Sequence, residues 1–125
     1  MDDMQKIATS HSPAISFDSA TGILTIEGHS IPENPINLFQ PLMEEVVKYC
    51  EKPAAKTLVE LRFDYCNTSS VKWIFHILEK FERIYVYDKQ VVEINFYYSD
   101  ENTLEMGKYL QINLAIPIDL IKVQQ

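Results

Sequence analysis

The sequence has 125 residues, about the length of one domain, and its hydrophobic share of 46% is ordinary for a protein with a buried core. Its 11 Lys and Arg stand against 18 Asp and Glu, and the formal net charge of -7 argues against binding to nucleic acid or to anionic lipid. No apolar run approaches the roughly 20 residues that span a bilayer, and the N-terminus does not resemble a secretory signal. We therefore expect a cytoplasmic protein without membrane insertion.

The first part of the sequence predicts a β-hairpin followed by a helix. Residues 1–12 are polar and aperiodic, which predicts a loose N-terminal arm. Two short strands are expected over 14–17 and 23–28, joined by a turn in which Gly22 is free to adopt a positive φ. Asn34 is a plausible N-cap with Pro35 at the first helical position. The apolar face expected of this helix consists of Phe39, Leu42, Met43, Val46, Val47 and Cys50.

The rest of the sequence alternates strands with helices. Residues 57–64 and 91–98 alternate apolar and polar side chains, as half-covered strands do. Residues 69–87 have helical periodicity, and a last helix is expected over about 101–113 with Ser99 or Asp100 as its cap. Residues 118–123 are expected to form either a short edge strand or a docked tail. The buried stripe predicted for the helix at 69–87 is Ile74, Ile77, Leu78, Phe81, Ile84 and Tyr85, with Lys72, His76, Glu79, Lys80 and Arg83 on its outer side.

This order predicts an α/β fold in which residues 1–125 form one domain. Strands separated by helices pair in parallel through right-handed crossovers, so a parallel part joins the N-terminal hairpin in a mixed sheet. The central strands are half-polar, which is unusual for a sheet covered on both faces. We therefore expect the helices to pack mainly on one face and to leave the other face exposed.

Four small polar residues, Asn67 to Ser70, lie where the chain leaves a strand and enters a helix. A single residue of this type is enough for an N-cap, and small polar residues also cluster in ordinary turns. The alternative interpretation is a phosphoacceptor, because a phosphate at a helix N-terminus meets free backbone N–H groups and the positive end of the helix dipole. Lys72, one turn into the helix, would add a positive charge.

Several motifs in order resemble those of the SiaC family of regulatory phosphoproteins, over most of the chain. The junction Tyr65-Cys66-Asn67-Thr68-Ser69-Ser70-Val71-Lys72 resembles the family signature Y-x-N-[ST]-S-S-x-K. The stretches at 9–18, 28–34 and 39–42 are similar to T-x-x-T/S-P-x-I-x-F-D, G-x-S-x-P-E-N and F-x-P-L. Near the C-terminus, Leu104-Glu105-Met106-Gly107 resembles the family's L-E-x-G.

The resemblance implies a STAS-like fold and a switch between partners. In this family a histidine-kinase-like protein kinase phosphorylates the domain and a PP2C-type phosphatase reverses the modification. The unphosphorylated form binds and activates a diguanylate cyclase, which links the protein to cyclic di-GMP and biofilm control. The resemblance places the phosphoacceptor at Thr68, with Ser69 and Ser70 as weaker candidates, and it implies neither an enzymatic activity nor a cofactor. The partner-binding residues expected here are Asn67, Thr68, Ser69, Lys72, His76, Glu33 and Asn34.

Two other functions stay open on the sequence alone. One is a STAS-like module that binds a small ligand or another protein without being phosphorylated. The other is a small enzyme that uses Cys66 or Ser69 as a nucleophile, although no partner for such a nucleophile is evident from spacing. Cys50 and Cys66 are expected to be free thiols, since a cytoplasmic protein is kept reduced. The three histidines share no spacing typical of metal ligands.

The negative charge is not spread evenly along the sequence. Residues 69–90 contain four basic and three acidic residues, whereas the rest contains seven basic and fifteen acidic residues. The segment that begins at the candidate phosphoacceptor is therefore the one that is not already negative, and a phosphate there would reverse its sign.

Overall fold

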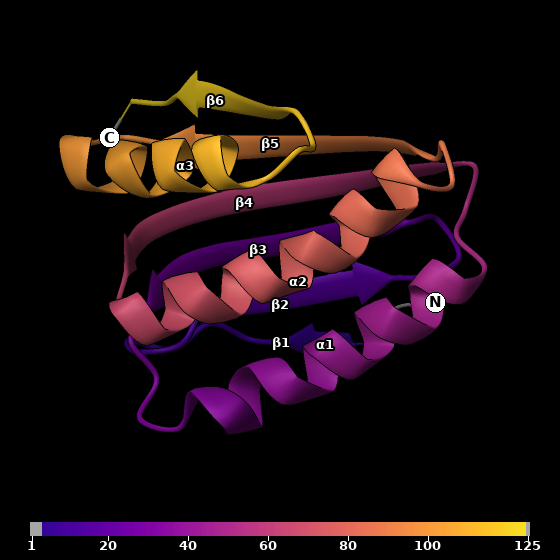
Figure 1. Ribbon diagram of the computed structural model, residues 1–125. Coiled ribbons are helices and arrows are strands. Elements are labelled where there is room, and N and C mark those ends of the chain that lie inside the picture. Colours follow the sequence, from indigo (N-terminus) through magenta and orange to yellow (C-terminus); the bar gives the residue numbers. More distant parts are fainter. Residues whose placement is uncertain (1–3, 125) are drawn as a thin grey trace.

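The alternation of apolar and polar residues along the strands builds a six-stranded mixed sheet, and the three helical segments pack against it (Figure 1). The computed structural model describes residues 4–124. In chain order the elements are β1 (Met4–Lys6), β2 (Ala14–Asp18), β3 (Ile23–Ser30), α1 (Pro35–Glu51), β4 (Lys56–Cys66), α2 (Thr68–Val86), β5 (Val91–Tyr98), α3 (Glu101–Asn113) and β6 (Ile118–Lys122).

The strands lie side by side in the order in which they occur in the sequence. The β1–β2 and β2–β3 pairs are antiparallel, and the β3–β4, β4–β5 and β5–β6 pairs are parallel. Each parallel pair is joined through one helix, and all three helices cover the same face of the sheet (Figure 1). The predicted fold class is thus confirmed: a mixed sheet with an N-terminal hairpin and helices on one face. Gly22, in the hairpin turn, has the positive φ of 75° expected for it.

The N-terminal segment differs from the prediction of a loose arm over 1–12. Met4–Lys6 form β1, which pairs with β2 through the Met4–Phe17, Gln5–Ser16 and Lys6–Ile15 positions. Met4 is half-buried and packs against the core, so this pairing is reinforced by apolar contact. The short strand has no periodicity of its own in the sequence, and its partner strand determines its conformation. The part of the predicted arm at 1–3 lies outside the described residues.

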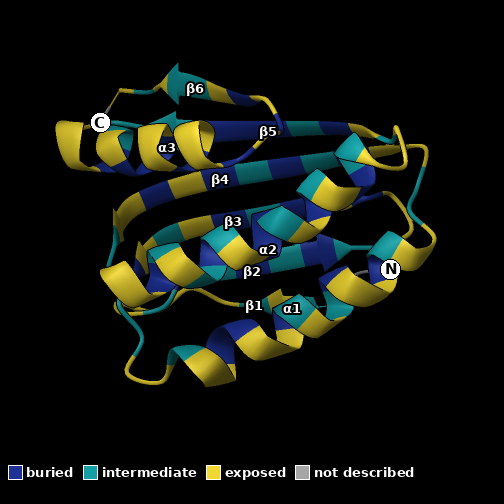
Figure 2. Cartoon of the chain, viewed as in Figure 1, coloured by how far each residue is buried: buried dark blue, intermediate teal, exposed yellow. Residues whose placement is uncertain are grey.

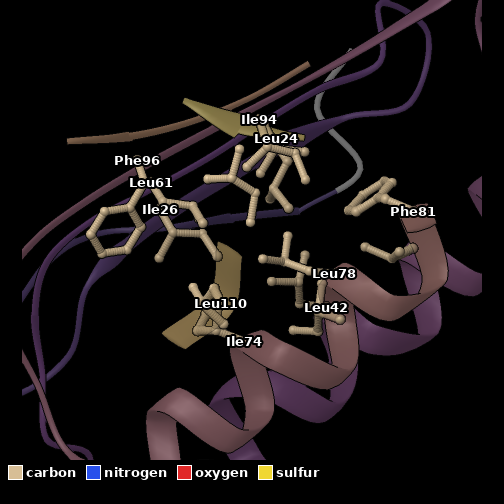
Figure 3. Packing of buried hydrophobic residues seen from close by; sticks show 14 of the residues in the cluster. Leu24, Ile26, Leu42, Leu61, Ile74, Leu78, Phe81, Ile94, Phe96 and Leu110 are labelled. Carbon is tan, nitrogen blue, oxygen red and sulfur yellow. The ribbon is translucent and has the colours of Figure 1, made fainter. Parts of the chain in front are cut away.

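The core lies between the sheet and the helices, where one side of each strand meets the apolar stripes of α1, α2 and α3. Figure 3 shows Leu24, Ile26, Leu61, Ile94 and Phe96 of the sheet facing Leu42 of α1, Ile74, Leu78 and Phe81 of α2, and Leu110 of α3. Figure 2 shows that the outward sides of the helices are exposed. The stripe predicted for α2 is buried except for Tyr85, which is half-buried.

The predicted apolar face of α1 is correct in part. Phe39, Leu42 and Val46 are buried, and Met43 and Cys50 are half-buried. Val47 was wrongly assigned to the core, because 44% of its surface is exposed. Two residues missing from the predicted face, Leu38 and Tyr49, are buried. Tyr49 is accommodated because its hydroxyl lies 2.7 Å from Thr57 Oγ1 and accepts the Ala54 N–H, so its polar end is satisfied.

The face of the sheet opposite the helices carries the polar residues of the central strands. Lys56 Nζ of β4 lies 3.0 Å from Glu93 Oε1 of β5. The guanidinium of Arg62 lies 4.7 Å from the centre of the Tyr97 ring, a cation–π contact between neighbouring strands. The half-polar strands in the sequence therefore do mark a sheet with an uncovered face.

Candidate phosphorylation and partner-binding site

The N-terminus of α2 is built around Asn67, the residue that follows β4. Its side-chain Oδ1 accepts the backbone N–H of Ser70 at 2.9 Å, and its carbonyl oxygen accepts the N–H of Val71 at 3.0 Å. Asn67 has extended backbone angles (φ -77°, ψ 170°), as expected for a residue that caps a helix. Of the four small polar residues at this junction, one is therefore the N-cap and the three hydroxyl residues lie inside the first helical turn.

These three hydroxyl residues have different surroundings. The side chain of Thr68 is exposed, and its hydroxyl has no hydrogen-bond partner within residues 4–124. Ser69 is also exposed, but its Oγ donates to Asn67 Oδ1 at 3.2 Å. Ser70 is fully buried at 0% exposure. A modifying enzyme can therefore reach the Thr68 oxygen directly, whereas Ser70 has no access to solvent.

Ser70 joins the start of α2 to the end of β3. Ser30 Oγ donates to Ser70 Oγ at 2.8 Å, and Ser70 Oγ donates to the Ser30 carbonyl oxygen at 3.2 Å. The Asn67 N–H donates to the same carbonyl at 2.9 Å. Ser30 is as fully buried as Ser70. This buried serine pair fixes the first turn of α2, and with it Thr68, on the edge of the sheet.

Sequence reasoning missed the role of Ser30. The signal for it was the serine of Gly28-His29-Ser30, which belongs to one of the family-like motifs. The two serines are 40 positions apart in the sequence. Only the parallel pairing of β3 with β4, in which Ser30 lies opposite Cys66, brings them together.

Lys72 and His76 lie on the outer side of α2, in line with Thr68. Residues four apart in a helix are neighbours on one face, so Thr68, Lys72 and His76 form a row. All three are exposed. His76 Nδ1 lies 2.8 Å from Glu79 Oε1, while Lys72 has no ion-pair partner in the described chain. The predicted site residues of α2 are thus brought together on one surface.

Glu33 and Asn34 lie at the same edge of the sheet, in the connection between β3 and α1. Both are exposed. This connection starts after Ser30, whose carbonyl oxygen accepts hydrogen bonds from the Asn67 N–H and the Ser70 hydroxyl. Asn34 is the N-cap of α1, as predicted, since its Oδ1 accepts the Asn37 N–H at 3.3 Å. Glu33 has no ion-pair partner among residues 4–124.

Cys66 has the properties of a half-buried structural thiol rather than of a nucleophile. Burial raises the pKa of its thiol to about 12, although the Ser70 and Ser30 hydroxyls act in the opposite direction. Burial likewise raises the pKa of Cys50 to about 11. A nucleophilic cysteine needs a lowered pKa and access to substrate, whereas the pKa of Cys66 is raised and its side chain is half-buried. No group of three or more metal-ligating side chains is found in residues 4–124, and within the same range no helix is long and apolar enough to cross a membrane.

A comparison with protein families decides the assignment. The family described as SiaC family regulatory phosphoprotein matches residues 7–123. The chain belongs to the SiaC family. An uncharacterised protein of Pseudomonas aeruginosa (strain UCBPP-PA14) is 30% identical to it over 119 residues, which are 94% of each chain.

Solved structures of SiaC share the fold along nearly the whole chain. Apo-SiaC of Pseudomonas aeruginosa superimposes with a TM-score of 0.88 and 26% identity, covering 97% of this chain and 98% of that one. A second match, with a TM-score of 0.89 and 26% identity, is the crystal structure of the diguanylate cyclase SiaD in complex with its activator SiaC from the same species. It covers 97% of this chain and 100% of that one. The family resemblance drawn from the motifs is thereby confirmed.

Proposed function

We propose that this SiaC-family chain is a switch in cyclic di-GMP signalling, controlled by phosphorylation of Thr68. In the unphosphorylated state it binds and activates a diguanylate cyclase. A histidine-kinase-like protein kinase transfers the γ-phosphoryl group of ATP to Thr68 Oγ1; the hydroxyl proton is released and ADP leaves. A PP2C-type phosphatase hydrolyses the ester and releases inorganic phosphate. The chain itself has no catalytic role, binds no cofactor and works in the cytoplasm.

The observation that carries this proposal is the free Thr68 hydroxyl at the first position of α2. A phosphate there adds roughly -1.5 to -2 charges at pH 7 and is much bulkier than a hydroxyl. The backbone N–H groups of Thr68 and Ser69 lie in the first helical turn and have no acceptor within residues 4–124, so they are available to the phosphate oxygens. Lys72 is one turn away on the same face.

The direction of the switch follows from the place of Thr68 on an exposed surface. A partner that packs on the start of α2 meets a small hydroxyl and Lys72 in the unphosphorylated chain. After phosphorylation the same partner meets a charged, hydrated group that also attracts Lys72. The activator relationship between SiaC and SiaD in Pseudomonas aeruginosa supports a cyclase as this partner.

The phosphorylation step is tested by measuring the intact mass of the chain before and after incubation with the candidate kinase and ATP. We expect the wild-type chain and Ser69→Ala to gain one phosphate and Thr68→Ala to gain none. Ser69→Ala is the matched control because Ser69 is the exposed neighbour of Thr68. A phosphate gained equally by Thr68→Ala would show that another residue is the acceptor.

The output is tested with the purified diguanylate cyclases of the source organism, by following conversion of GTP to cyclic di-GMP with and without the chain. We expect one cyclase to be activated by the unphosphorylated chain and by Thr68→Ala, but not by the phosphorylated chain. If no cyclase responds, the proposed output is wrong. If the kinase and ATP suppress activation by Thr68→Ala as they do for wild type, Thr68 is not the regulated residue. That result would favour the alternative of a binding module that is not controlled by phosphorylation of Thr68.

A further inference from the structure

An apolar patch crosses from α2 to α3 on the outer surface of the helical layer. Ile112 of α3 is 80% exposed and Tyr109 is 46% exposed, although both are large hydrophobic residues. They are three positions apart and so are neighbours on the helix surface. The ring of half-buried Phe75, on α2, lies 6.1 Å from the ring of Tyr109 between centres. The three side chains therefore form one apolar strip over the α2–α3 boundary.

Helical spacing connects this strip with the candidate phosphorylation site. Phe75 follows Thr68 by seven positions, two helical turns, so the two side chains lie on nearly the same side of α2. The distance along the helix is about 10 Å at 1.5 Å per residue. Lys72 lies between them, four positions after Thr68 and three before Phe75. A partner that covers Phe75 and Tyr109 would therefore extend over Thr68.

Each outer border of the strip carries an unpaired lysine. Lys72 lies beside Phe75 on α2, and Lys108 precedes Ile112 by one helical turn on α3. Both are exposed, and neither has an ion-pair partner in the part of the chain that the structure describes. Glu105, one turn before Tyr109, forms the N-terminal border. We name Lys72, Phe75, Lys108, Tyr109 and Ile112 the α2–α3 patch.

We propose that the α2–α3 patch is the surface on which the diguanylate cyclase docks, through a segment whose apolar side chains are flanked by carboxylates. This rests on the proposed function, since it names the contact surface of the cyclase partner. Exposed apolar side chains with a lysine on each outer side complement such a segment, and Glu105 borders only the N-terminal end: apolar anchors give affinity, and the charges orient the partner. A partner whose binding is controlled by a phosphate on Thr68 has to cover the surface next to Thr68, and in the proposed function that partner is the cyclase. A phosphate on Thr68 would lie at one end of the α2–α3 patch. It would also compete with the carboxylates of the partner for Lys72.

The test measures how much chain is needed for half-maximal activation of the cyclase that the wild-type chain activates. We expect Ile112→Ser to raise that concentration about tenfold, the scale of losing one anchor residue. Tyr87→Ser is the matched control: Tyr87 is 77% exposed and lies at the C-cap of α2, away from Thr68. Because both side chains are so exposed, neither substitution should unfold the chain. Thr68 should be phosphorylated equally in both variants.

Two further variants test whether the charge of Lys108 contributes to binding and whether the contact is confined to the α2–α3 patch. Lys108→Glu should weaken activation, and added salt should reduce the difference from wild type. Ile36→Ser alters another exposed apolar residue, 60% exposed, at the start of α1, and should have no effect. A photo-reactive phenylalanine analogue in place of Ile112 should cross-link to the cyclase, whereas the same analogue in place of Tyr87 should not.

The outcomes separate this inference from the proposed function. If the wild-type chain activates no cyclase, the proposed function fails first. If the wild-type chain activates and Ile112→Ser does so equally well, or if Ile36→Ser is the variant that loses activity, the α2–α3 patch is not the docking surface. If Ile112→Ser instead converts a dimer of the chain alone to a monomer without affecting activation, the patch is covered by a second copy and the inference is overturned.

Discussion

At the scale of single residues, the junction at 67–70 shows how adjacent hydroxyl groups acquire separate roles. Thr68 projects into solvent, Ser69 bonds to the capping Asn67, and Ser70 is buried against Ser30. Their positions in the first turn of α2 determine this, because each successive residue points about 100° further around the helix. Only one of the three combines access to solvent with a free hydroxyl.

The buried serine pair leads to a stability prediction. Ser70→Ala removes the hydroxyl that accepts from Ser30 Oγ and leaves that buried donor with only the weakly accepting Cys66 thiol, so the free energy of unfolding should fall by about 1–3 kcal/mol. Ser69→Ala, on the exposed side of the same turn, should change it by less than about 0.5 kcal/mol. Urea denaturation of both variants and of wild type measures the difference. Equal stabilities for the two variants would show that the Ser30–Ser70 contact contributes nothing.

The half-buried thiol of Cys66 predicts that stability depends on pH in the alkaline range. The folded state raises the pKa from an ordinary 9.0 to about 12, so the folded chain holds the thiol proton more tightly than the unfolded chain. The stabilisation is complete below about pH 9 and is lost as the pH rises toward 12. We expect the free energy of unfolding to decrease over pH 9–11 in wild type and to decrease less in Cys66→Ala. Denaturation curves at several pH values test this, and an unchanged slope in Cys66→Ala would contradict it.

At this scale the sequence predicts part of the site. Capping propensity identifies Asn34 and the Asn67–Ser70 junction, because a cap depends on residues within one turn. The family-like motif singles out Thr68, but sequence alone does not distinguish the environments of Thr68 and Ser70. The contact of Ser70 with Ser30 depends on the register of β3 against β4, a long-range property that no local pattern encodes.

At the scale of elements, the close approach of α3 to the sheet depends on Gly107. A Cβ at this position would lie 2.8 Å from Phe96 Cδ1 and 2.9 Å from Leu120 Cδ2, closer than van der Waals contact. The glycine of the Leu104-Glu105-Met106-Gly107 motif therefore has a structural explanation. It lets the helix pack directly on β5 and β6.

We predict that Gly107→Ala destabilises the fold even though alanine favours helix. Overpacking against Phe96 and Leu120 costs about 1–3 kcal/mol, which exceeds the gain of about 1 kcal/mol in helix propensity. Glu105→Ala, at an exposed position of the same helix, should be neutral or slightly stabilising. Thermal denaturation followed by circular dichroism compares them. A higher melting temperature for Gly107→Ala than for wild type would contradict the close packing of α3.

Most elements were predictable from local pattern, including the short strands β2 and β6 (the latter as one of two alternatives), but the three-residue β1 was not. The bounds expected for the last helix, 101–113, and for the strand at 91–98 agree with the structure because caps and alternation delimit them. β1 has three residues and exists only through pairing with β2. On α1, the aromatic ring of Tyr49 is buried in place of Val47, because its hydroxyl finds partners in Thr57 and Ala54. The hydrophobic pattern of α1 alone does not predict that Tyr49 is buried instead of Val47, because it contains no information about these tertiary contacts.

At the scale of the whole molecule, the proposed phosphorylation of Thr68 is expected to act without refolding the domain. Thr68 is exposed, and the core cluster contains neither Thr68 nor Lys72. Amide hydrogen exchange of the phosphorylated and unphosphorylated chains should therefore differ only around residues 67–72, with the protection of β4 and β5 unchanged. Loss of protection in the central strands after phosphorylation would instead indicate a global conformational change.

The parallel crossovers align the dipoles of the three helices. β3, β4 and β5 run in the same direction, so α1, α2 and α3 all begin at one edge of the sheet, capped by Asn34, Asn67 and Asp100. Each helix carries roughly half a positive elementary charge at its start, and the three partial charges lie at the same end. The backbone of the helical layer therefore has its positive end there, in a molecule with a net charge of -7. Thr68 is the first residue of α2 and lies at this positive end, where the backbone favours an added anion.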